Sequence, residues 1–247
     1  MKTHILVALL CTCTLTLSHA SAPQKMQLFL LIGQSNMAGR GKVEACDQVA
    51  SSQIWMLDKQ NCWVAAKDPL HFDKPKVAGV GLASEFARCV AKKMPSTAIG
   101  LIPCAFGGTS LDQWKPGSDL YSNAVARAKI ALKDGQLAGI LWHQGEADSS
   151  RTKIETYAPR FATMIAHLRH DLNAPDVPVI VGELGYFNEG YKRFNANLPT
   201  VVRAVKNCQQ VSADGLEHGG DNVHFSAAAL REFGRRYFEC WQKLTTP

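Results

Sequence analysis

The chain lacks several sequence features that would place it in a functional class at once. It has no CxxC pair and no HExxH motif, which argues against a bound metal ion such as zinc. The formal net charge is +6, but the basic residues are scattered and form no runs, so nucleic-acid binding is not indicated. It has no internal repeat and no low-complexity linker. These absences favour a single ordinary globular domain.

Only the N-terminus carries a long apolar run outside the expected core. It begins with Lys2, is apolar from Ile5 to Leu17 and ends in small residues, which is typical of a secretory signal. The run is shorter than the ~20 residues of a membrane-spanning helix. Because Ser18-His19-Ala20 fits the small-x-small rule, we expect cleavage after Ala20 or nearby. Residues 21–247 would then form one domain, secreted or periplasmic, with no membrane association.

Six of the eight cysteines would remain after this cleavage: Cys46, Cys62, Cys89, Cys104, Cys208 and Cys240. An even number in an exported chain allows up to three disulfides. We favour a bond between Cys46 and Cys62, because the two flank one short segment. The other pairings and the oligomeric state stay open.

Apolar runs alternate with longer amphipathic segments along the chain. The runs predict strands at 26–33, 53–58, 98–105, 137–145 and 177–185. The segments between them predict helices near 81–94, 119–134, 152–172 and 188–207, the last interrupted at Pro199, and a final helix at 226–244 capped by Ser226. This alternation predicts an α/β protein, a three-layer α/β/α sandwich around a parallel sheet.

The most polar, glycine-rich segments follow the predicted strands. They read GQSN at 33–36, AFGGTSLDQW at 105–114 and WHQGEAD at 142–148, and a fourth, GGDNVHFS, lies at 219–226. Ligands bind outside the carboxyl ends of the strands in sheets of this kind. We therefore expect the functional site at this edge of the sheet.

These segments contain the groups that acyl transfer by serine requires: a hydroxyl, a base and donors for the oxyanion. Ser35 follows a turn that a glycine permits. His224 is a candidate base, and Asp221, three residues upstream, can fold back to its ring. The backbone around Gly108 and the amide of Gln144 are candidate oxyanion donors.

Other interpretations of the same residues remain open. Ser35 could only cap the turn, and Asp221 with its neighbour could form a turn that leaves His224 on the surface. Glu146 and Asp148 are an alternative carboxylate pair for glycoside cleavage. The GxSxG elbow is absent, because Ser35 lies in G-Q-S-N-M, so a serine hydrolase here would not be of the lipase type.

Four motifs together resemble the SGNH hydrolase superfamily, and more narrowly carbohydrate esterase family 6 and the related sialate O-acetylesterase-like proteins. They are GQSNM (33–37), GGTSLDQW (107–114), WHQGEAD (142–148) and DNVHFS (221–226), in the order of the family and spread over nearly the whole exported chain. The resemblance implies a flavodoxin-like sandwich with five parallel strands. It also implies hydrolysis of acetyl esters on carbohydrates without a metal ion or cofactor.

The resemblance implies roles for the site residues as well. Ser35 matches the nucleophile, His224 the base and Asp221 the acid that orients it. The oxyanion hole matches the backbone N–H of Ser35, the backbone N–H of Gly108, with Gly107 as the alternative, and the side chain of Gln144.

Three further residues are implied to bind substrate or to support the site. Asn36 follows the serine directly. Trp114 would offer a flat apolar face to a sugar ring, or else lie in the core. Glu146 would support the site or serve as an alternative acidic partner of His224, and we favour support.

The function expected from these motifs is that of a secreted serine esterase that removes O-acetyl groups from poly- or oligosaccharides. The short chain, with no accessory β domain, favours acetylxylan-type substrates. Sialate O-acetylesterase activity is the alternative, and a non-catalytic carbohydrate-binding protein on the same scaffold is a further one. No nucleic-acid partner is expected.

Overall fold

The computed structural model describes residue 23 and residues 25–246. The predicted signal segment and its cleavage point lie outside these residues. Within the described part, no helix is both long enough and apolar enough to cross a bilayer.

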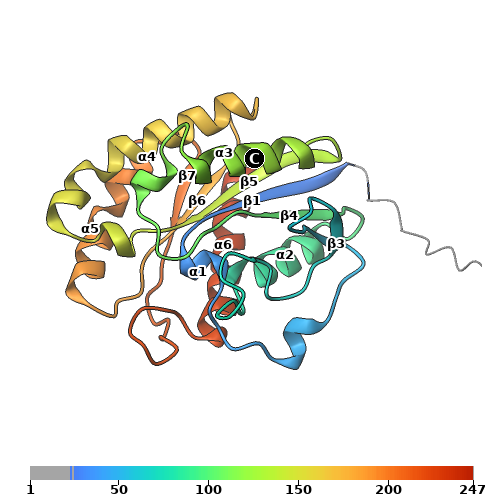
Figure 1. Ribbon diagram of the computed structural model, residues 1–247, viewed down its shortest axis with the longest axis horizontal. Coiled ribbons are helices and arrows are strands. Elements are labelled where there is room, and N and C mark those ends of the chain that lie inside the picture. Colours follow the sequence, from blue (N-terminus) through green and yellow to red (C-terminus); the bar gives the residue numbers. More distant parts are fainter. Residues whose placement is uncertain (1–22, 24, 247) are drawn as a thin grey trace, which may run out of the picture.

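The described residues form a seven-stranded sheet between two layers of helices (Figure 1). The strands are β1 (Met26–Gly33), β2 (Ile54–Leu57), β3 (Trp63–Ala65), β4 (Ile99–Pro103), β5 (Gly135–His143), β6 (Val179–Gly182) and β7 (Cys208–Val211). Their order is β3-β2-β4-β1-β5-β6-β7. All neighbours pair in parallel except β3, which is antiparallel to β2. The predicted α/β class and three-layer sandwich are confirmed.

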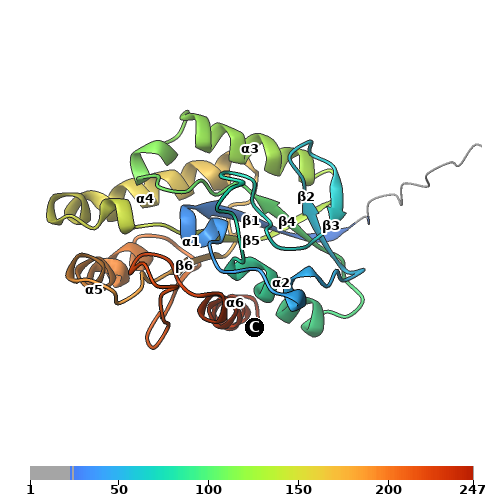
Figure 2. The ribbon, with the colours of Figure 1, turned by 60° about the horizontal axis from the view of Figure 1, so that its bottom comes forward.

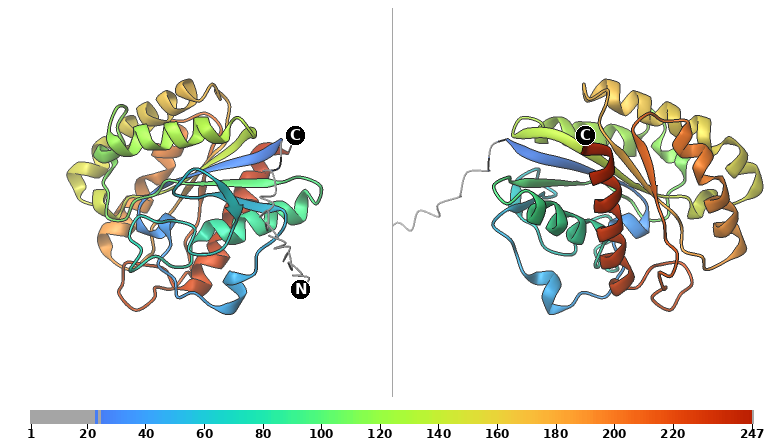
Figure 3. Two further views of the ribbon diagram at one scale, coloured as in Figure 1. Left: turned by 45° about the vertical axis from the view of Figure 1, so that its right-hand side comes forward. Right: turned by 180° about the vertical axis from the view of Figure 1, so that it is seen from behind.

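Helices cover both faces of the sheet. They are α1 (Ser35–Ala38), α2 (Leu82–Lys93), α3 (Asp119–Ala131), α4 (Arg151–Asp171), α5 (Glu189–Arg203) and α6 (Ala227–Thr245), with the 3-10 turns η1 (Ala45–Gln48), η2 (Leu111–Trp114) and η3 (Glu146–Asp148). Figure 2 shows α3 and α4 on one side of the sheet and α2 and α6 on the other. The dark red α6 lies alongside the green α2 in the right-hand view of Figure 3.

The central strand β1 is buried on both faces because neighbouring strands and helices surround it. Leu28, Leu30 and Ile32 pack into the core that includes α3, α4 and α5. Phe29 and Leu31 point the other way, into the core that includes α2 and α6. This two-sided burial explains why β1 is a continuous apolar run and lacks polar alternation. It also places the end of β1, and therefore Ser35, at the centre of the sheet.

The five predicted strands are present, but the predicted number is wrong because β3 and β7 were not foreseen. Both are short and lie at the two edges of the sheet, and most of their residues are only half-buried or exposed. A short edge strand with polar residues such as CQQV carries no apolar run to detect. The expected interruption at Pro199 is also wrong, since α5 continues through this residue.

All six cysteines within the described residues are free thiols, so the predicted Cys46–Cys62 disulfide is wrong. Cys46 lies in η1, where its carbonyl accepts a hydrogen bond from Arg88 of α2. Cys62 lies in the turn between β2 and β3, where the adjacent Asn61 accepts one from Arg127 of α3. Because α2 and α3 cover opposite faces of the sheet, proximity in sequence does not bring the two thiols together.

Candidate active site

A crevice of about 580 Å³ opens at the carboxyl edge of the sheet, above the end of β1. It is lined by Gln34, Ser35, Arg40, Lys74, Val77, Gly107, Gly108, Asp221, Val223 and His224. Three of the four polar segments predicted from the sequence therefore meet here. The fourth, HQGE after β5, does not line the crevice.

The turn that presents Ser35 depends on Gly33. Its φ of +128° lies in a region that L side chains rarely adopt. A Cβ at this position would clash with the carbonyl oxygen of His143 on β5. Gln34 N donates a hydrogen bond to the same carbonyl, at 2.8 Å. The chain thus turns abruptly at the strand end, and Ser35 begins α1 at the floor of the crevice.

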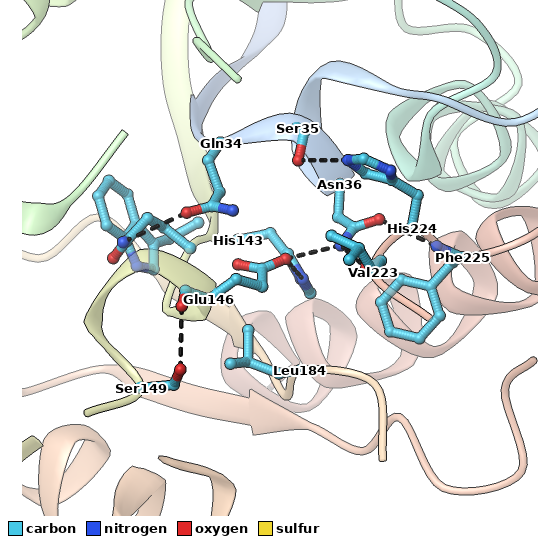
Figure 4. Close-up of polar contacts among 12 residues, drawn as sticks. Gln34, Ser35, Asn36, His143, Glu146, Ser149, Leu184, Val223, His224 and Phe225 are labelled. Atoms are coloured by element: carbon cyan, nitrogen blue, oxygen red, sulfur yellow. Dashed lines mark hydrogen bonds and ion pairs between the residues drawn. The ribbon is translucent and has the colours of Figure 1, made fainter. Parts of the chain in front are cut away.

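Ser35, His224 and Asp221 form a hydrogen-bonded line, and Figure 4 shows its contact between Ser35 and His224. Ser35 Oγ lies 3.0 Å from His224 Nε2, and His224 Nδ1 lies 2.6 Å from Asp221 Oδ2. With the Nδ1 proton donated to the carboxylate, Nε2 is left to accept the hydroxyl proton. The serine is 6% exposed, whereas the side chains of His224 and Asp221 are 28% and 52% exposed. The line runs from the floor of the crevice to solvent.

Asp221 is held in its charged form. Partial burial disfavours the charge, but hydrogen bonds from the backbone N–H groups of His224 and Val223, together with the His224 ring, outweigh it. The pKa of Asp221 falls to about 2 as a result. An ionised carboxylate at this position fixes the ring tautomer and would stabilise an imidazolium.

The GGT loop at 107–109 presents one backbone donor to the crevice. Gly107 N donates to Asp73 Oδ2 at 2.8 Å and is therefore occupied. Gly108 N has no hydrogen-bond partner among the described residues, and neither has Ser35 N. A φ of +82° at Gly108 places its peptide in a conformation that favours glycine. The two backbone donors predicted from the sequence are thus both unoccupied beside the crevice.

The third predicted donor, Gln144, is placed differently from the expectation. It is fully buried, and its Nε2 donates to Thr109 O at 3.0 Å and to Asp148 Oδ2 at 2.7 Å. Its Oε1 accepts a hydrogen bond from Tyr157 at 2.8 Å. Both N–H groups are engaged, so the structure offers no Gln144 donor to the crevice.

A glutamine that the sequence interpretation passed over does line the crevice. Gln34 immediately precedes Ser35, and its Oε1 lies 3.4 Å from Gln144 Nε2. In this orientation Oε1 accepts the weak contact, and Gln34 Nε2 has no hydrogen-bond partner among the described residues (Figure 4). The only signal in the sequence is its position inside GQSNM, next to the serine.

Trp114 does not face the crevice, which corrects its predicted role as a surface for a sugar ring. It is 1% exposed, and its ring lies edge-on to Trp142 with centroids 5.6 Å apart. Its Nε1 donates to Thr109 Oγ1 at 3.1 Å, so the tryptophan supports the GGT loop from the core. Phe106, at 40% exposure, is the exposed aromatic residue adjoining this loop.

Asn36 is buried and ties α1 to the segment that carries His224. Its Nδ2 donates to Val223 O at 3.1 Å, and its Oδ1 accepts from Phe225 N at 3.1 Å. These two backbone groups flank His224 on either side. The same Nδ2 donates to Glu146 Oε1 at 2.6 Å. Asn36 therefore supports the serine–histidine geometry and does not face the crevice.

Glu146 is bound to Asn36 and not to His224, whose ring nitrogen pairs with Asp221. Burial raises the pKa of Glu146 to about 7 and lowers that of the neighbouring His143 to about 3. The 3.8 Å approach between these two side chains is therefore no ion pair near neutral pH, because His143 is uncharged.

The alternative carboxylate pair for glycoside cleavage finds no support in this arrangement. Asp148 is fully buried and accepts hydrogen bonds from Gln144 Nε2 and from Leu111 N. Glu146 is directed towards Asn36, and neither carboxylate lines the crevice. Both belong to the structure that supports the strand ends.

Comparison with known proteins agrees with the motifs. The sequence matches the family model described as carbohydrate esterase, sialic acid-specific acetylesterase, over residues 25–243. A probable carbohydrate esterase of Arabidopsis thaliana is 34% identical over 231 residues, which cover 84% of this chain and 87% of the relative. The X-ray structure of that Arabidopsis protein superposes with a TM-score of 0.83 at 32% identity, covering 89% of this chain and 98% of the other.

Two more distant structures share the fold. NanS matches with a TM-score of 0.75 at 19% identity, covering 90% of this chain and 98% of NanS. A variant of an acetyl xylan esterase from Geobacillus stearothermophilus matches with a TM-score of 0.52 at 13% identity, covering 89% and 96% of the two chains. With nearly the whole described sequence matched by one family, the chain belongs to the carbohydrate esterases of the sialic acid-specific acetylesterase family and is a carboxylic ester hydrolase.

Proposed function

We propose that this protein is an exported serine esterase that removes O-acetyl groups from carbohydrates through Ser35, His224 and Asp221. The observation that carries the proposal is the line of these three side chains, with contacts of 3.0 and 2.6 Å, at the floor and wall of a crevice. A non-catalytic carbohydrate-binding protein would need the crevice but not this line.

The reaction proceeds in two steps. His224 Nε2 takes the proton of Ser35 Oγ as that oxygen attacks the acetyl carbonyl carbon. The tetrahedral intermediate collapses, the C–O bond to the sugar breaks, and His224 returns the proton to the departing sugar oxygen. Water then attacks the acetyl-serine with His224 again as base, releasing acetate and restoring the Ser35 hydroxyl. Asp221 stabilises the imidazolium in both steps.

The oxyanion is stabilised by the backbone N–H groups of Ser35 and Gly108 and by Nε2 of Gln34. These three groups adjoin the crevice and have no other partner among the described residues, whereas the Gln144 amide is consumed by its buried contacts. Unoccupied donors aimed at the developing charge need no rearrangement during the reaction, which is what makes them effective. Gln34 thus takes the role that the sequence motif suggested for Gln144.

Acetylated polysaccharide of the acetylxylan type is the substrate we propose first. The crevice is open, and its wall at His224 and Asp221 reaches solvent. An acetyl group on an internal sugar can enter such a site while the rest of the polymer lies across the surface. A deep, closed pocket would admit only small esters.

O-acetylated sialic acid is a second candidate, favoured by Lys74. This lysine lines the crevice and forms no ion pair with any acidic group of the described residues. Its Nζ lies 3.7 Å from the position that a Cβ on Gly108 would take. An ammonium group so close to the oxyanion donors could bind the carboxylate of sialic acid. The description of the matched family also names this sugar.

The test is acetate release from acetylated xylo-oligosaccharides and from O-acetyl sialic acid, measured side by side with wild-type protein and Ser35→Ala. We expect the alanine variant to lose about four orders of magnitude in kcat with almost no change in Tm. Equal rates for the two proteins on p-nitrophenyl acetate would reject Ser35 as nucleophile. Failure of an organophosphate to label Ser35 would favour the non-catalytic alternative.

A further inference from the structure

We propose that Asp73 and Arg40 form a positioning latch that aims the Gly108 N–H at the oxyanion. The inference rests on the proposed function of the crevice and adds two residues to its machinery that no motif identifies. Arg40 follows the nucleophile helix α1, and Asp73 lies in the connection between β3 and α2. They are 33 residues apart in sequence and meet beside Ser35.

The latch is a buried ion pair. Arg40 Nη2 lies 2.7 Å from Asp73 Oδ2, and the two side chains are only 7% and 1% exposed. Burial disfavours the charged form of Asp73, but hydrogen bonds from Arg40 and from Gly107 N outweigh it and hold the pKa of the carboxyl below its ordinary value. Burying a charged pair costs desolvation free energy, so stability alone does not account for this pair at the edge of the crevice.

The same carboxylate oxygen also controls the direction of the loop. Asp73 Oδ2 accepts the hydrogen bond of Gly107 N at 2.8 Å, which ties this amide to the carboxylate. The next amide, that of Gly108, is then left without a partner among the described residues and adjoins the crevice. The two amides belong to successive planar peptide units joined at the Gly107 Cα, so anchoring the first unit fixes the position from which the second is oriented. Asp73 thus gives the two adjacent N–H groups different roles. Gly107 N holds the loop, and Gly108 N is left to bind the oxyanion.

Arg40 connects this loop to the nucleophile. Its Nη1 donates to Gly39 O at 2.7 Å, and Gly39 N donates to Ser35 O at 2.9 Å. The packing around Gly107 is tight, since a Cβ there would clash with Arg40 Nη2 and lie 3.4 Å from Ser35 Cβ. The distance between the serine and the oxyanion donors is therefore set through the latch.

The other contacts of the loop do not fix this amide. Phe106 N donates to Gly33 O, and Thr109 Oγ1 donates to Phe106 O. Both hold the ends of the loop, whereas Asp73 alone among the described residues binds Gly107 N. Loss of the Asp73 carboxylate should let the peptide unit that carries Gly107 N rotate, while the fold stays intact.

The chain contains a matched control pair outside the crevice. Asp47 of η1 is fully buried, accepts a hydrogen bond from Arg231 Nη2 of α6 at 2.7 Å, and also accepts one from a backbone N–H, that of Glu44, at 2.8 Å. Both sites contain an arginine, a buried carboxylate and a backbone amide, and Arg231 additionally pairs with the exposed carboxylate of Glu44 at 2.7 Å. They differ in that only Asp73 holds an amide of the GGT loop.

Single substitutions would leave one charge buried without its partner, so uncharged double variants are the test. Arg40→Gln with Asp73→Asn keeps a side-chain oxygen that can accept Gly107 N. Arg40→Met with Asp73→Ala removes it. On p-nitrophenyl acetate we expect the Met/Ala variant to lose kcat on the order of 10- to 100-fold with KM within about 3-fold. The Gln/Asn variant should retain at least about 5-fold more kcat than the Met/Ala variant.

The corresponding control variants, Asp47→Ala with Arg231→Met and Asp47→Asn with Arg231→Gln, should keep the wild-type kcat even where Tm falls. The latch is rejected if the two Arg40/Asp73 variants have equal kcat, if the loss is in KM, or if the Asp47/Arg231 variants lose kcat as much. Failure of the proposed function gives a different result, because Ser35→Ala would then retain the wild-type turnover.

Discussion

The ends of β1 and β5 carry similar polar sequences, GQSN and HQGE, but the fold uses them in different ways. After β1, Gln34 and Ser35 line the crevice. After β5, Gln144 is fully buried, and Glu146 binds Asn36 from behind the crevice. The end of β1 thus presents groups to the substrate, and the neighbouring end of β5 supports those groups. A polar residue at the carboxyl edge of a sheet is therefore not evidence of contact with substrate.

The difference arises from the turn that follows each strand. At Gly33 the chain turns at once into α1, which leaves Gln34 and Ser35 at the surface of the crevice. Beyond His143 the Gln144 side chain is fully buried, where it donates a hydrogen bond to Asp148 of η3 and accepts one from Tyr157 of α4. Burial then converts a potential oxyanion donor into a structural one.

The two glutamines provide the strongest test of this division. Gln34→Ala should lower kcat on the order of 100- to 1000-fold, the usual effect of losing one oxyanion donor, with little change in stability. Gln144→Ala should instead lower the free energy of unfolding by about 2–4 kcal/mol, because Asp148 and Tyr157 lose buried partners. Steady-state kinetics and urea denaturation of both variants measure the two effects. If Gln144→Ala lost more kcat than Gln34→Ala, the assignment of the glutamines would have to be exchanged.

Asn36 links the two strand ends, so its loss should have an intermediate effect. Asn36→Ala releases the backbone on both sides of His224 and breaks the contact to Glu146. We expect kcat to fall on the order of 10- to 100-fold, because a displacement of about 1 Å between base and nucleophile is costly. KM should change little.

Asn36→Asp is a matched variant that keeps Oδ1 for the backbone N–H of Phe225 but replaces the donor to Val223 O and Glu146 by an acceptor. Its kcat should lie between those of wild type and Asn36→Ala if the contact with Phe225 N matters most. A kcat for Asn36→Ala equal to that of wild type would show that the His224 segment is held without this link.

The sequence predicts the parts of this molecule that depend on local pattern. The strands of the sheet centre were found because two-sided burial requires uninterrupted apolar runs such as 26–33. No such run marks the edge strands, because β3 has only three residues and β7 is polar at Gln209 and Gln210. Ser35, Asp221 and His224 could be named because each belongs to a short motif, and the fold brings them together.

The roles of the remaining site residues depend on tertiary contacts, which sequence patterns do not encode. Whether Gln34 or Gln144 faces the crevice depends on how the chain leaves each strand, which no periodicity encodes. Arg40 and Asp73 belong to no common motif, and only the path of the connection before α2 brings them together. Trp114 shows the same limit, because a tryptophan after a glycine loop can point outward or, as here, into the core.

The smallest expected effect is a pH dependence of stability that arises from Glu146, at the supporting end of β5. Burial raises the pKa of Glu146 from 4.5 to about 7, so the folded protein binds this proton more tightly than the unfolded chain does. The resulting stabilisation is complete below pH ~4.5 and is lost as the pH rises through ~7. The loss is on the order of 1–3 kcal/mol. Glu146→Gln keeps an oxygen for Asn36 and carries no charge. It should therefore match wild type at pH 5 and be more stable than wild type at pH 8.

Urea denaturation at these two pH values measures the difference, and the exposed Glu155 of α4 supplies the control. Glu155→Gln should leave the change in unfolding free energy between pH 5 and pH 8 as it is in wild type, because its carboxylate stays in water in both states. Equal destabilisation of Glu146→Gln at both pH values would mean that the carboxylate is held charged by a partner. Glu146 would then be more than a neutral acceptor for Asn36. The end of β5 would in that case carry a functional charge, and the contrast with the end of β1 would be one of position and not of role.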